Sequence, residues 1–237
     1  MSLTAIILAG GFGTRLSKVV AGVPKPMAPV RNRPFLDYQL SWLSKNGCKN
    51  AILCTGYLAE TISEHYGNRF RDMSIDYSVE KEPLGTGGAV KKAFDQRDDN
   101  EVLVVNGDSM FEIDLTLLMD LHGTHRAECS VALRHVADTS RYGSIDIDSS
   151  NRVVAFREKT QAGGPGLING GIYLLNRQAF LRHAPSAANF SLENDFFTKK
   201  TDTMKLHGFV FDSYFIDIGI PSDYDRAQHE FERFEDR

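Results

Sequence analysis

The sequence lacks the features of a membrane-spanning or nucleic-acid-binding protein. None of its apolar runs reaches the roughly 18 residues that a membrane-spanning helix needs. Its first apolar stretch, residues 3–8, is short and has no basic segment before it, unlike a signal peptide. The formal net charge of -4 at pH 7 is opposite in sign to the basic excess of general nucleic-acid binders. We therefore expect neither a membrane nor a nucleic acid as a partner.

Cysteine is scarce as well. Cys48, Cys54 and Cys129 lie in apolar contexts, and none of them forms a CxxC pair. Buried thiols in a reducing compartment explain this pattern better than disulfides or metal ligands do. Internal repeats, low-complexity tracts and linkers are also missing. The sequence thus predicts a soluble, cytoplasmic protein with a single domain over residues 1–237, and it leaves open whether the chain forms a homo-oligomer.

Short aliphatic runs indicate three strands in the first half of the chain, at residues 5–8, 51–54 and 102–105. Helix-length segments separate them. This alternation predicts an α/β fold with a mainly parallel central sheet that helices flank. In such sheets ligands bind beyond the carboxyl ends of the strands, so we expect the chemistry there.

The helical segments are recognised by their spacing. Leu36, Leu40 and Leu43 lie on one face of a predicted helix between Pro34 and Gly47, two residue types that commonly bracket helices. Further helices are expected at residues 59–65, 88–94 and, with Pro221 near the start, about 221–234.

After about residue 126 strands dominate the pattern. They are expected at residues 129–134, 144–147, 152–156 and 172–175, with few helices between them. Such a succession indicates a smaller antiparallel lobe, which could cover one side of the active site.

A glycine-rich turn, LAGGFGTRL at residues 8–16, directly follows the first predicted strand. Gly10, Gly11 and Gly13 allow a tight turn and bring backbone N–H groups close to phosphate oxygens. Arg15 adds a planar fork of donors that suits a triphosphate. Taken alone, the pattern fits an ordinary strand–helix turn equally well. It is not a P-loop, because no Gly-Lys-Ser/Thr follows, and Leu16 stands where a dinucleotide fingerprint needs a small residue.

Three further side chains become candidates by their position. Lys25, which has prolines on both sides, is held in a restricted backbone and could neutralise the same phosphates. Asp108 and Asp217 each follow an apolar run, at the edge of the sheet where ligands bind. Mg²⁺ prefers one or two carboxylates together with phosphate oxygens and water. Singly, each residue is explained as well by an ordinary surface turn, and only their combination indicates a metal-bridged phosphate site.

The seven histidines show no catalytic or metal-binding spacing. His122 and His125 are near neighbours, and we expect them at a solvated helix end. Histidine therefore contributes no candidate site residue.

Six motifs occur in the order found in the sugar-nucleotide pyrophosphorylase family, which the chain resembles over essentially its whole length. They are LAGGFGTRL at residues 8–16, PKP at 24–26, EPLGT at 82–86, NGD at 106–108, NGGI at 169–172 and DIG at 217–219. The resemblance implies a Rossmann-like nucleotidyltransferase fold and Mg²⁺-dependent transfer of a nucleotidyl group to a sugar 1-phosphate, with release of pyrophosphate. It also implies a nucleotide-binding part over about residues 1–125 and a sugar-binding, closing part over about residues 126–237.

The resemblance also implies roles at the matching positions. The nucleotide would be bound by Leu8, Gly10, Gly11, Gly13, Thr14, Glu80, Gly85 and Thr86. The catalytic residues would be Arg15, Lys25, Asp108 and Asp217, of which the two aspartates would hold Mg²⁺. The sugar phosphate would be bound by Gly143, Glu158, Lys159 and Asn169, with Lys159 on the phosphate. Because a sugar phosphate is already an anionic nucleophile at neutral pH, the reaction needs positioning and charge stabilisation, not a general base.

The base is partly predictable from Glu80, which stands where relatives place a base-contacting side chain. A carboxylate only accepts hydrogen bonds, and guanine offers two adjacent donors, N1–H and N2–H. A bidentate match of this kind discriminates between bases by about 1–3 kcal/mol. GTP is therefore favoured, while UTP and dTTP stay open, because Glu80 could instead pair with a cation such as Lys81.

The sugar is suggested by three stretches that resemble the short family members which activate D-glycero-α-D-manno-heptose 1-phosphate with GTP. These are VVAGVPKPMAP at residues 19–29, GTGGA at 85–89 and FSLEND at 190–195. Mannose 1-phosphate is the close alternative, since one exocyclic carbon changes binding by only about 1–3 kcal/mol. A catalytically inactive sugar-nucleotide binder would be expected to lack Arg15, Lys25, Asp108 or Asp217, and a dinucleotide-dependent oxidoreductase would need the full glycine fingerprint.

Overall fold

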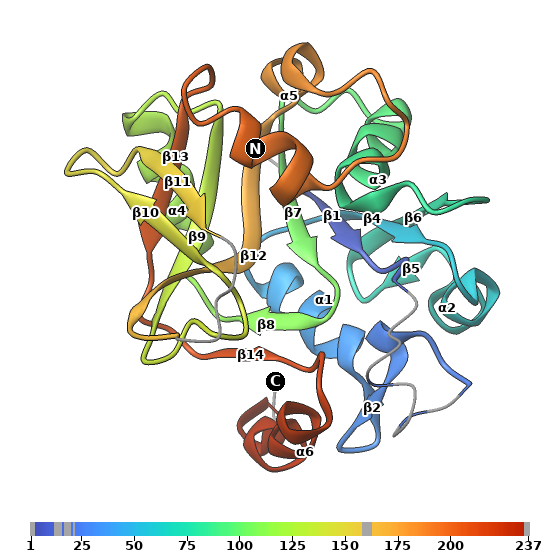
Figure 1. Ribbon diagram of the computed structural model, residues 1–237. Coiled ribbons are helices and arrows are strands. Elements are labelled where there is room, and N and C mark those ends of the chain that lie inside the picture. The colour runs from blue at the N-terminus through green and yellow to red at the C-terminus, as the bar shows by residue number, and fades with distance from the viewer. Residues whose placement is uncertain (1–2, 12–15, 17–19, 21, 158–162, 235–237) are drawn as a thin grey trace. The chain divides into compact units, whose positions relative to one another are not determined.

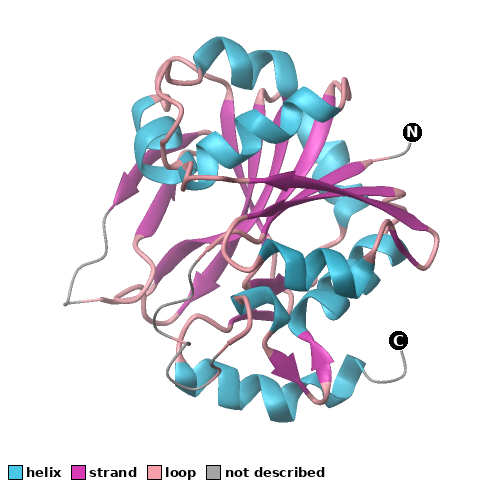
Figure 2. Ribbon diagram, turned by 90° about the vertical axis from the view of Figure 1, so that its right-hand side faces the viewer, coloured by secondary structure: helices cyan, strands magenta, loops and turns pink. Residues whose placement is uncertain are grey.

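The computed structural model describes residues 3–11, 16, 20, 22–157 and 163–234. The chain divides into two compact units, each built from segments that are separated in the sequence. The first unit comprises Met1–Pro83, Val105–Met110 and Phe215–Arg237, and the second comprises Leu84–Val104 and Phe111–Tyr214. Both units contain helices and strands (Figures 1 and 2). The organisation as one domain stays a prediction.

Parallel strands form the sheet of the first unit. β1 (Thr4–Leu8) pairs in parallel with β4 (Asn50–Thr55), and β4 pairs in parallel with β6 (Met73–Val79). β5 (Arg69–Phe70) adds a short antiparallel edge to β6. β1 and β4 are buried along nearly their whole length, which explains their continuous apolar sequences and confirms both predictions. β6 was not predicted.

Among its described residues, the first unit has three α-helices: α1 (Phe35–Lys45), α2 (Ala59–Tyr66) and α6 (Pro221–Glu230). All three confirm predicted helices. The three predicted leucines of α1 are fully buried, and Gly47 follows its end with φ of +84°. Short 3₁₀ turns cover Lys25–Met27 and Phe231–Phe234.

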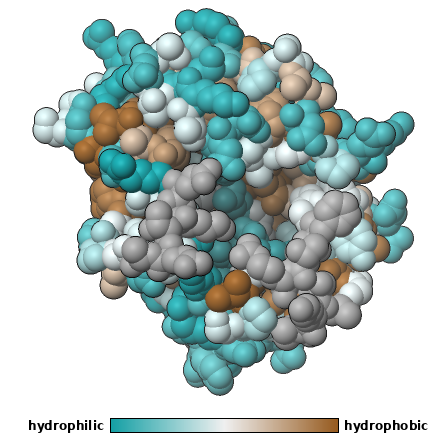
Figure 3. All heavy atoms as spheres, in the orientation of Figure 1, coloured by the Kyte–Doolittle hydropathy of each residue, from teal (hydrophilic) through white to brown (hydrophobic). Residues whose placement is uncertain are grey.

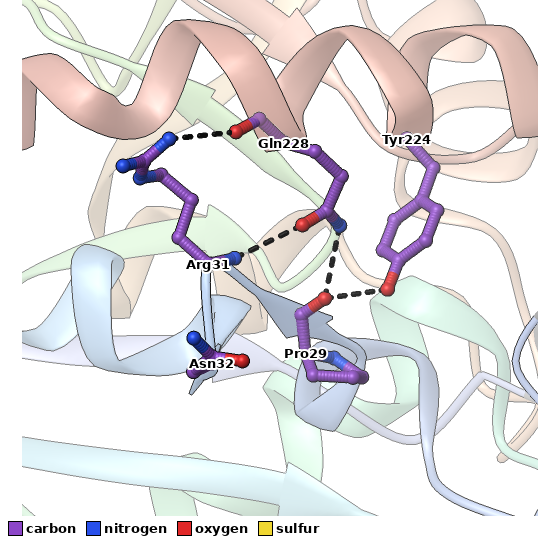
Figure 4. A pocket seen from close by; sticks show the side chains of 5 residues that line it. All are labelled: Pro29, Arg31, Asn32, Tyr224 and Gln228. Carbon is purple, nitrogen blue, oxygen red and sulfur yellow. Dashed lines mark hydrogen bonds between the residues drawn. The ribbon is translucent and has the colours of Figure 1, made fainter.

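A β-hairpin near the beginning of the chain contacts α6. β2 (Pro29–Val30) and β3 (Arg33–Pro34) are joined by Arg31 and Asn32, whose positive φ angles of 45° and 65° match the two-residue turns that favour hairpins. Gln228 of α6 forms two hydrogen bonds with this hairpin (Figure 4). Its Nε2 donates to the Pro29 carbonyl, and its Oε1 accepts from the Arg31 N–H, both at 3.0 Å. The Tyr224 hydroxyl donates to the same carbonyl at 2.5 Å. A shallow pocket of about 530 Å³ lies among these residues.

The second unit is arranged around β9 (Cys129–Val136). β12 (Gly166–Asn176) pairs with β9 in antiparallel fashion, and β13 (Leu206–Val210) pairs with it in parallel. β10 (Ser144–Ile147) and β11 (Val153–Arg157) form a separate antiparallel hairpin. The four predicted strands are confirmed, although β12 begins six residues earlier than expected. Apolar side chains gather over β10, β11 and β13 on the left of Figure 3. Val154 of β11 and Val210 of β13 are about half exposed.

The helices of the second unit are α3 (Gly85–Ala93), α4 (Leu115–Thr124) and α5 (Arg177–His183). Shorter turns cover Phe94–Gln96, Leu192–Phe196 (a π-helix) and Phe197–Lys199. α3 confirms a predicted helix. Only the end of α4 was predicted, and α5 was not. The side chains of Asp114 and Asn176 cap these helices in the usual way by accepting from Leu117 N–H and Ala179 N–H.

The largest sheet has eight strands in the order β13-β9-β12-β7-β1-β4-β6-β5, where β7 is Glu101–Asn106. Residues 101–104 of β7 belong to the second unit and residues 105–106 to the first. Two-stranded sheets complete the fold, among them β14 (Phe215–Asp217) with β8 (Ser109–Phe111). The predicted α/β class with a mainly parallel sheet and a smaller antiparallel part is confirmed.

Two predictions about single residue types have different outcomes. The three cysteines are buried, as expected, and form no disulfide within the part of the chain that the structure describes. The expected helix end at His122 and His125 is found, because α4 ends at Thr124. The expected solvation of His122 is wrong: the side chain is 3% exposed, and its Nδ1 lies 2.7 Å from Ser130 Oγ. Burial lowers the pKa of His122 to about 4. His125 ends α4 and packs its ring on His207 and Phe209.

Among the described helices, none combines the length and apolar character that crossing a bilayer requires.

Candidate active site

The carboxyl ends of the parallel strands bring two predicted nucleotide-binding residues together. Beyond β1 and β6, backbone N–H groups of Ala9 and Glu80 donate to carbonyls at the end of β4, at 2.9 and 2.7 Å. Gly10 lies against the Glu80 side chain: a Cβ at Gly10 would come within 3.1 Å of Glu80 Oε1. A glycine at position 10 thus leaves room for the carboxylate at this edge of the sheet. Gly11 is exposed, with no atom within 4 Å of where its Cβ would lie.

The loop after β7 is held against β1. Gly107 N–H donates to the Leu8 carbonyl at 3.0 Å, and a Cβ at Gly107 would approach that oxygen to 2.6 Å. From the other side, the buried Gln39 of α1 donates from Nε2 to the carbonyls of Asn106 and Ser109, at 2.8 and 2.6 Å. These contacts fix the backbone on both sides of Asp108. Gln39 was missed by the sequence reasoning, and its only signal was a polar side chain within the apolar part of a helix.

Lys25 joins the two predicted metal ligands. Its Nζ lies 2.5 Å from Asp108 Oδ2 and 3.8 Å from Asp217 Oδ1. The Lys25 side chain is 11% exposed, so the ammonium is largely shielded from water. Opposite charges in such a setting attract more strongly than they do in solvent. The structure therefore brings together three residues that lie up to 192 positions apart in the sequence.

Asp217 is positioned by the backbone around it. Ile218 N–H donates to the Asp108 carbonyl at 3.0 Å, which ties the two acidic loops together. Gly219 N–H donates to Asp217 Oδ1 at 2.6 Å. A Cβ at Gly219 would lie 2.7 Å from Asp217 Oδ1 and 3.0 Å from Lys25 Nζ. Glycine at this position therefore allows the cluster to close.

The second unit contains a separate pocket of about 340 Å³. Two predicted sugar-binding residues, Gly143 and Asn169, line it. The remaining lining residues are Tyr142, Ser144, Ile145, Phe156, Arg157, Glu193, Asn194 and Thr198. The Arg157 guanidinium is paired with Asp146 at 2.5–2.6 Å, and this pairing raises the pKa of Arg157. The pocket combines an aromatic wall with amide, hydroxyl and carboxylate groups, as polar-ligand sites do.

Gly85 and Thr86 also belong to the second unit. Gly85 has φ of +69°, and a Cβ there would lie 2.6 Å from the Phe190 carbonyl oxygen. Thr86 Oγ1 accepts from Leu192 N–H at 2.8 Å and donates to Glu193 Oε2 at 2.9 Å. Glu193 was not predicted as a site residue, because nothing local in the sequence connects it to Thr86.

Comparison with known proteins identifies the family. The family model described as "Nucleotidyl transferase" matches residues 4–233. The chain belongs to the nucleotidyl transferase family.

Three members or solved structures of this kind are especially similar. The D-glycero-alpha-D-manno-heptose 1-phosphate guanylyltransferase of Aneurinibacillus thermoaerophilus is 45% identical over 98% of this chain and 100% of its own length. The protein of the same name from Campylobacter jejuni is 42% identical over 94% of this chain and 97% of its own. The crystal structure of HddC from Yersinia pseudotuberculosis complexed with GMP-PN has a TM-score of 0.85 at 36% identity and covers 98% and 100% of the two chains.

For a nucleotidyl transferase, the cluster in the first unit fits the divalent ion that the sequence resemblance implies. Asp108 and Asp217 offer hard oxygen ligands, and both already lie near one cation, the Lys25 ammonium. Within the described ranges, no group of three or more His, Cys, Asp or Glu side chains could hold a metal. A pair of carboxylates suits Mg²⁺, which takes its other ligands from phosphates and water.

Five predicted residues lie outside the described residues: Gly13, Thr14, Arg15, Glu158 and Lys159. Their roles as nucleotidyl transferase site residues stay predictions.

Proposed function

We propose that the protein transfers GMP from GTP to D-glycero-α-D-manno-heptose 1-phosphate and releases pyrophosphate. The observation that carries this proposal is the meeting of Lys25 with Asp108 and Asp217, in a member of the nucleotidyl transferase family. An ammonium beside two carboxylates is suited to a reaction in which a polyanion and a metal ion are held together. The buried cysteines, which form no disulfide among the described residues, agree with a reducing, cytoplasmic location.

The proposed chemistry is an in-line displacement. An oxygen of the sugar phosphate forms a bond to the α-phosphorus of GTP, and the bond from that phosphorus to the bridging oxygen breaks. Pyrophosphate leaves with the electron pair of that bond. Because the attacking phosphate oxygen is already anionic, no proton has to be removed from it. Lys25 would bind phosphate oxygens, and the predicted Arg15 would assist it. Asp108 and Asp217 would hold Mg²⁺, which when bound would offset negative charge on the phosphates.

Glu80 would select the base. Its carboxylate would accept from guanine N1–H and N2–H, the only adjacent pair of ring-edge donors among the common bases. A Cβ at Gly10 would lie 3.1 Å from Glu80 Oε1, so glycine at position 10 avoids crowding of this carboxylate. This selection is supported by the two relatives that are named guanylyltransferases.

The sugar is proposed from the same two relatives, and mannose 1-phosphate is the second candidate. The pocket in the second unit offers Asn169, Glu193 and Thr198 as hydrogen-bonding groups for hydroxyls. The manno ring is common to both sugars, so one pocket could accept either.

The test is a substrate panel. Pyrophosphate release is measured with Mg²⁺, four nucleoside triphosphates, and the 1-phosphates of the heptose, mannose and glucose. We expect the highest kcat/KM for GTP with the heptose. Preference for another sugar would change the substrate within the family, and absence of turnover with every pair would favour a protein that only binds sugar nucleotides.

The role of Glu80 in base selection is tested by a substitution. Glu80→Gln should reduce the preference for GTP over UTP by about 10- to 100-fold, because one acceptor oxygen becomes a donor. Glu82→Gln, an exposed neighbour, is the matched control and should keep the preference. An unchanged preference in Glu80→Gln would show that another residue selects the base.

A further inference from the structure

Glu193 accepts hydrogen bonds on both carboxylate oxygens while it lines the pocket of the second unit. Oε1 accepts from the Tyr173 hydroxyl at 2.8 Å. Oε2 accepts from Thr86 Oγ1 at 2.9 Å and from Ser191 Oγ at 3.1 Å. Glu193 belongs to a π-helix, Leu192–Phe196, and such elements often occur at functional sites. Glu193 is therefore held in one orientation within the pocket.

The same network orients Asn169. Gly171 N–H can only donate, and it lies 2.9 Å from Asn169 Oδ1, so the amide nitrogen must face Tyr173. Asn169 Nδ2 donates to the Tyr173 hydroxyl at 2.6 Å, and that hydroxyl donates onward to Glu193. Tyr173 is fully buried, and burial, together with the charge of Glu193, raises its pKa well above its usual value. Tyr173 thus stays protonated and keeps the direction of the chain.

Glu193 and Asn169 keep hydrogen-bonding positions that their described partners do not occupy. A carboxylate has about four acceptor positions, and three are occupied by the described partners of Glu193. An amide nitrogen has two hydrogens, and Asn169 uses one on Tyr173. One acceptor position and one donor hydrogen are left within this network. A sugar hydroxyl both donates and accepts, so neighbouring hydroxyls on one ring match this pair.

We propose that Glu193 is a sugar-recognition residue, whose carboxylate accepts a hydrogen bond from one ring hydroxyl of the sugar 1-phosphate. Tyr173 and Thr86 are positioning residues that orient this carboxylate. The proposal rests on the proposed function, because it takes a sugar 1-phosphate as the ligand. It extends that function to a residue that lies 24 positions beyond Asn169 in the sequence.

The experiment measures binding of sugar 1-phosphates by calorimetry, so that turnover is not required. Wild type and Glu193→Gln are titrated with the heptose and mannose 1-phosphates and with mannose 1-phosphates that lack single ring hydroxyls. We expect Glu193→Gln to weaken binding of the complete sugar roughly 10- to 100-fold, as is typical for loss of a hydrogen bond to a charged group. One deoxy analogue should bind wild type more weakly by a similar factor and should lose little more in Glu193→Gln.

This crossed comparison separates recognition from a structural role. A purely structural effect would weaken every analogue by the same factor in Glu193→Gln, and that result would overturn the proposal. Glu60→Gln, an exposed glutamate of α2, is the matched control and should bind all sugars as wild type does. If Glu193→Gln does not fold, Glu193→Asp serves in its place, because it keeps the charge and retracts the carboxylate by one methylene.

The two proposals fail in different ways. If Glu193→Gln loses the same affinity for every analogue while wild type turns over the substrates, the role of Glu193 is overturned and the proposed transferase activity stands. Selective loss with one analogue, without turnover for any substrate pair, would support Glu193 and contradict the proposed function. Absence of sugar 1-phosphate binding in wild type would overturn both.

Discussion

The two units hold their polar side chains in different ways. In the first unit, full charges meet directly: the Lys25 ammonium lies near two carboxylates, one in the turn after β7 and the other at the end of β14. In the second unit, one carboxylate is surrounded by hydroxyl groups in a network that includes no cation among the described residues. Phosphates and metal ions are bound by charge, which acts over distance, whereas sugar hydroxyls are distinguished by the direction of hydrogen bonds. The difference matches the two kinds of substrate that we propose.

The charged arrangement of the first unit is tested most severely by Asp108→Asn. The change removes one negative charge beside Lys25 with little change in shape, and we expect kcat/KM to fall by about 10²–10³-fold. Pyrophosphate release over a Mg²⁺ titration measures this loss. Asp120→Asn, on the exposed face of α4, is the matched control. Activity within a few-fold of wild type in Asp108→Asn would remove the cluster from the mechanism.

The second unit buries the titratable side chain of His122, so the free energy of unfolding should depend on pH. His122 is neutral when folded, with a pKa of about 4, and titrates near 6.5 when unfolded. Below pH 6.5 the unfolded state therefore binds the proton first, and stability falls as the pH decreases towards 4. The total loss is about 3 kcal/mol, of which about 2 kcal/mol is reached at pH 5. Glu101, 3.7 Å from His122 Nε2, is the nearby carboxylate that would oppose this effect.

Urea unfolding at pH 7.5 and pH 5 measures it. His122→Gln cannot titrate, so its free energy of unfolding should change less between the two pH values than that of wild type. Contributions from other groups, such as His207, occur in both proteins and cancel. Equal pH dependence in the two proteins would contradict the burial argument.

Two helical glycines of the second unit give opposite predictions. A Cβ at Gly88 in α3 would lie 2.1 Å from the Ala188 carbonyl oxygen, and backbone cannot move aside easily. Gly88→Ala should therefore destabilise the protein by about 1–3 kcal/mol. Gly123 in α4 has no atom within 4 Å of its Cβ position, so Gly123→Ala should stabilise it by about 0.5–1 kcal/mol. Melting temperatures of the two variants should move in opposite directions. A higher melting temperature of Gly88→Ala would contradict the close packing of α3, and a lower one of Gly123→Ala would contradict the open space beside α4.

The smallest effect is expected where α6 meets the hairpin of the first unit. Tyr224→Phe removes one donor to the Pro29 carbonyl, which keeps its second donor, Gln228 Nε2. We expect a loss of about 1 kcal/mol or less. Gln228→Ala removes two hydrogen bonds and should cost more in denaturant unfolding. The reverse order would mean that Gln228 contributes little to holding the helix.

Among β1, β4, β6 and β7, the sequence predicts the three strands that are buried along most of their length and misses β6, which is partly exposed. β1, β4 and β7 are continuous apolar runs and were recognised. β6 alternates apolar residues with Ser74, Asp76 and Ser78, a pattern typical of a half-buried strand, and an expectation based on continuous apolar runs does not include it. The motifs suggested Lys25, Asp108 and Asp217 as one site, and the structure places these side chains together. Glu193 lies within the FSLEND stretch but was not predicted as a site residue, because its contact with Thr86 spans 107 positions.

The division of the first unit into three segments has a consequence for synthesis of the protein. Lys25 and the hairpin at residues 29–34 leave the ribosome early, but Asp217 and Gln228 are made about 190 residues later. The first unit therefore cannot complete its charged cluster or dock α6 until translation has passed the entire second unit. We expect the nascent chain to keep this surface open for most of its synthesis, whereas the second unit is already complete once residue 214 has emerged.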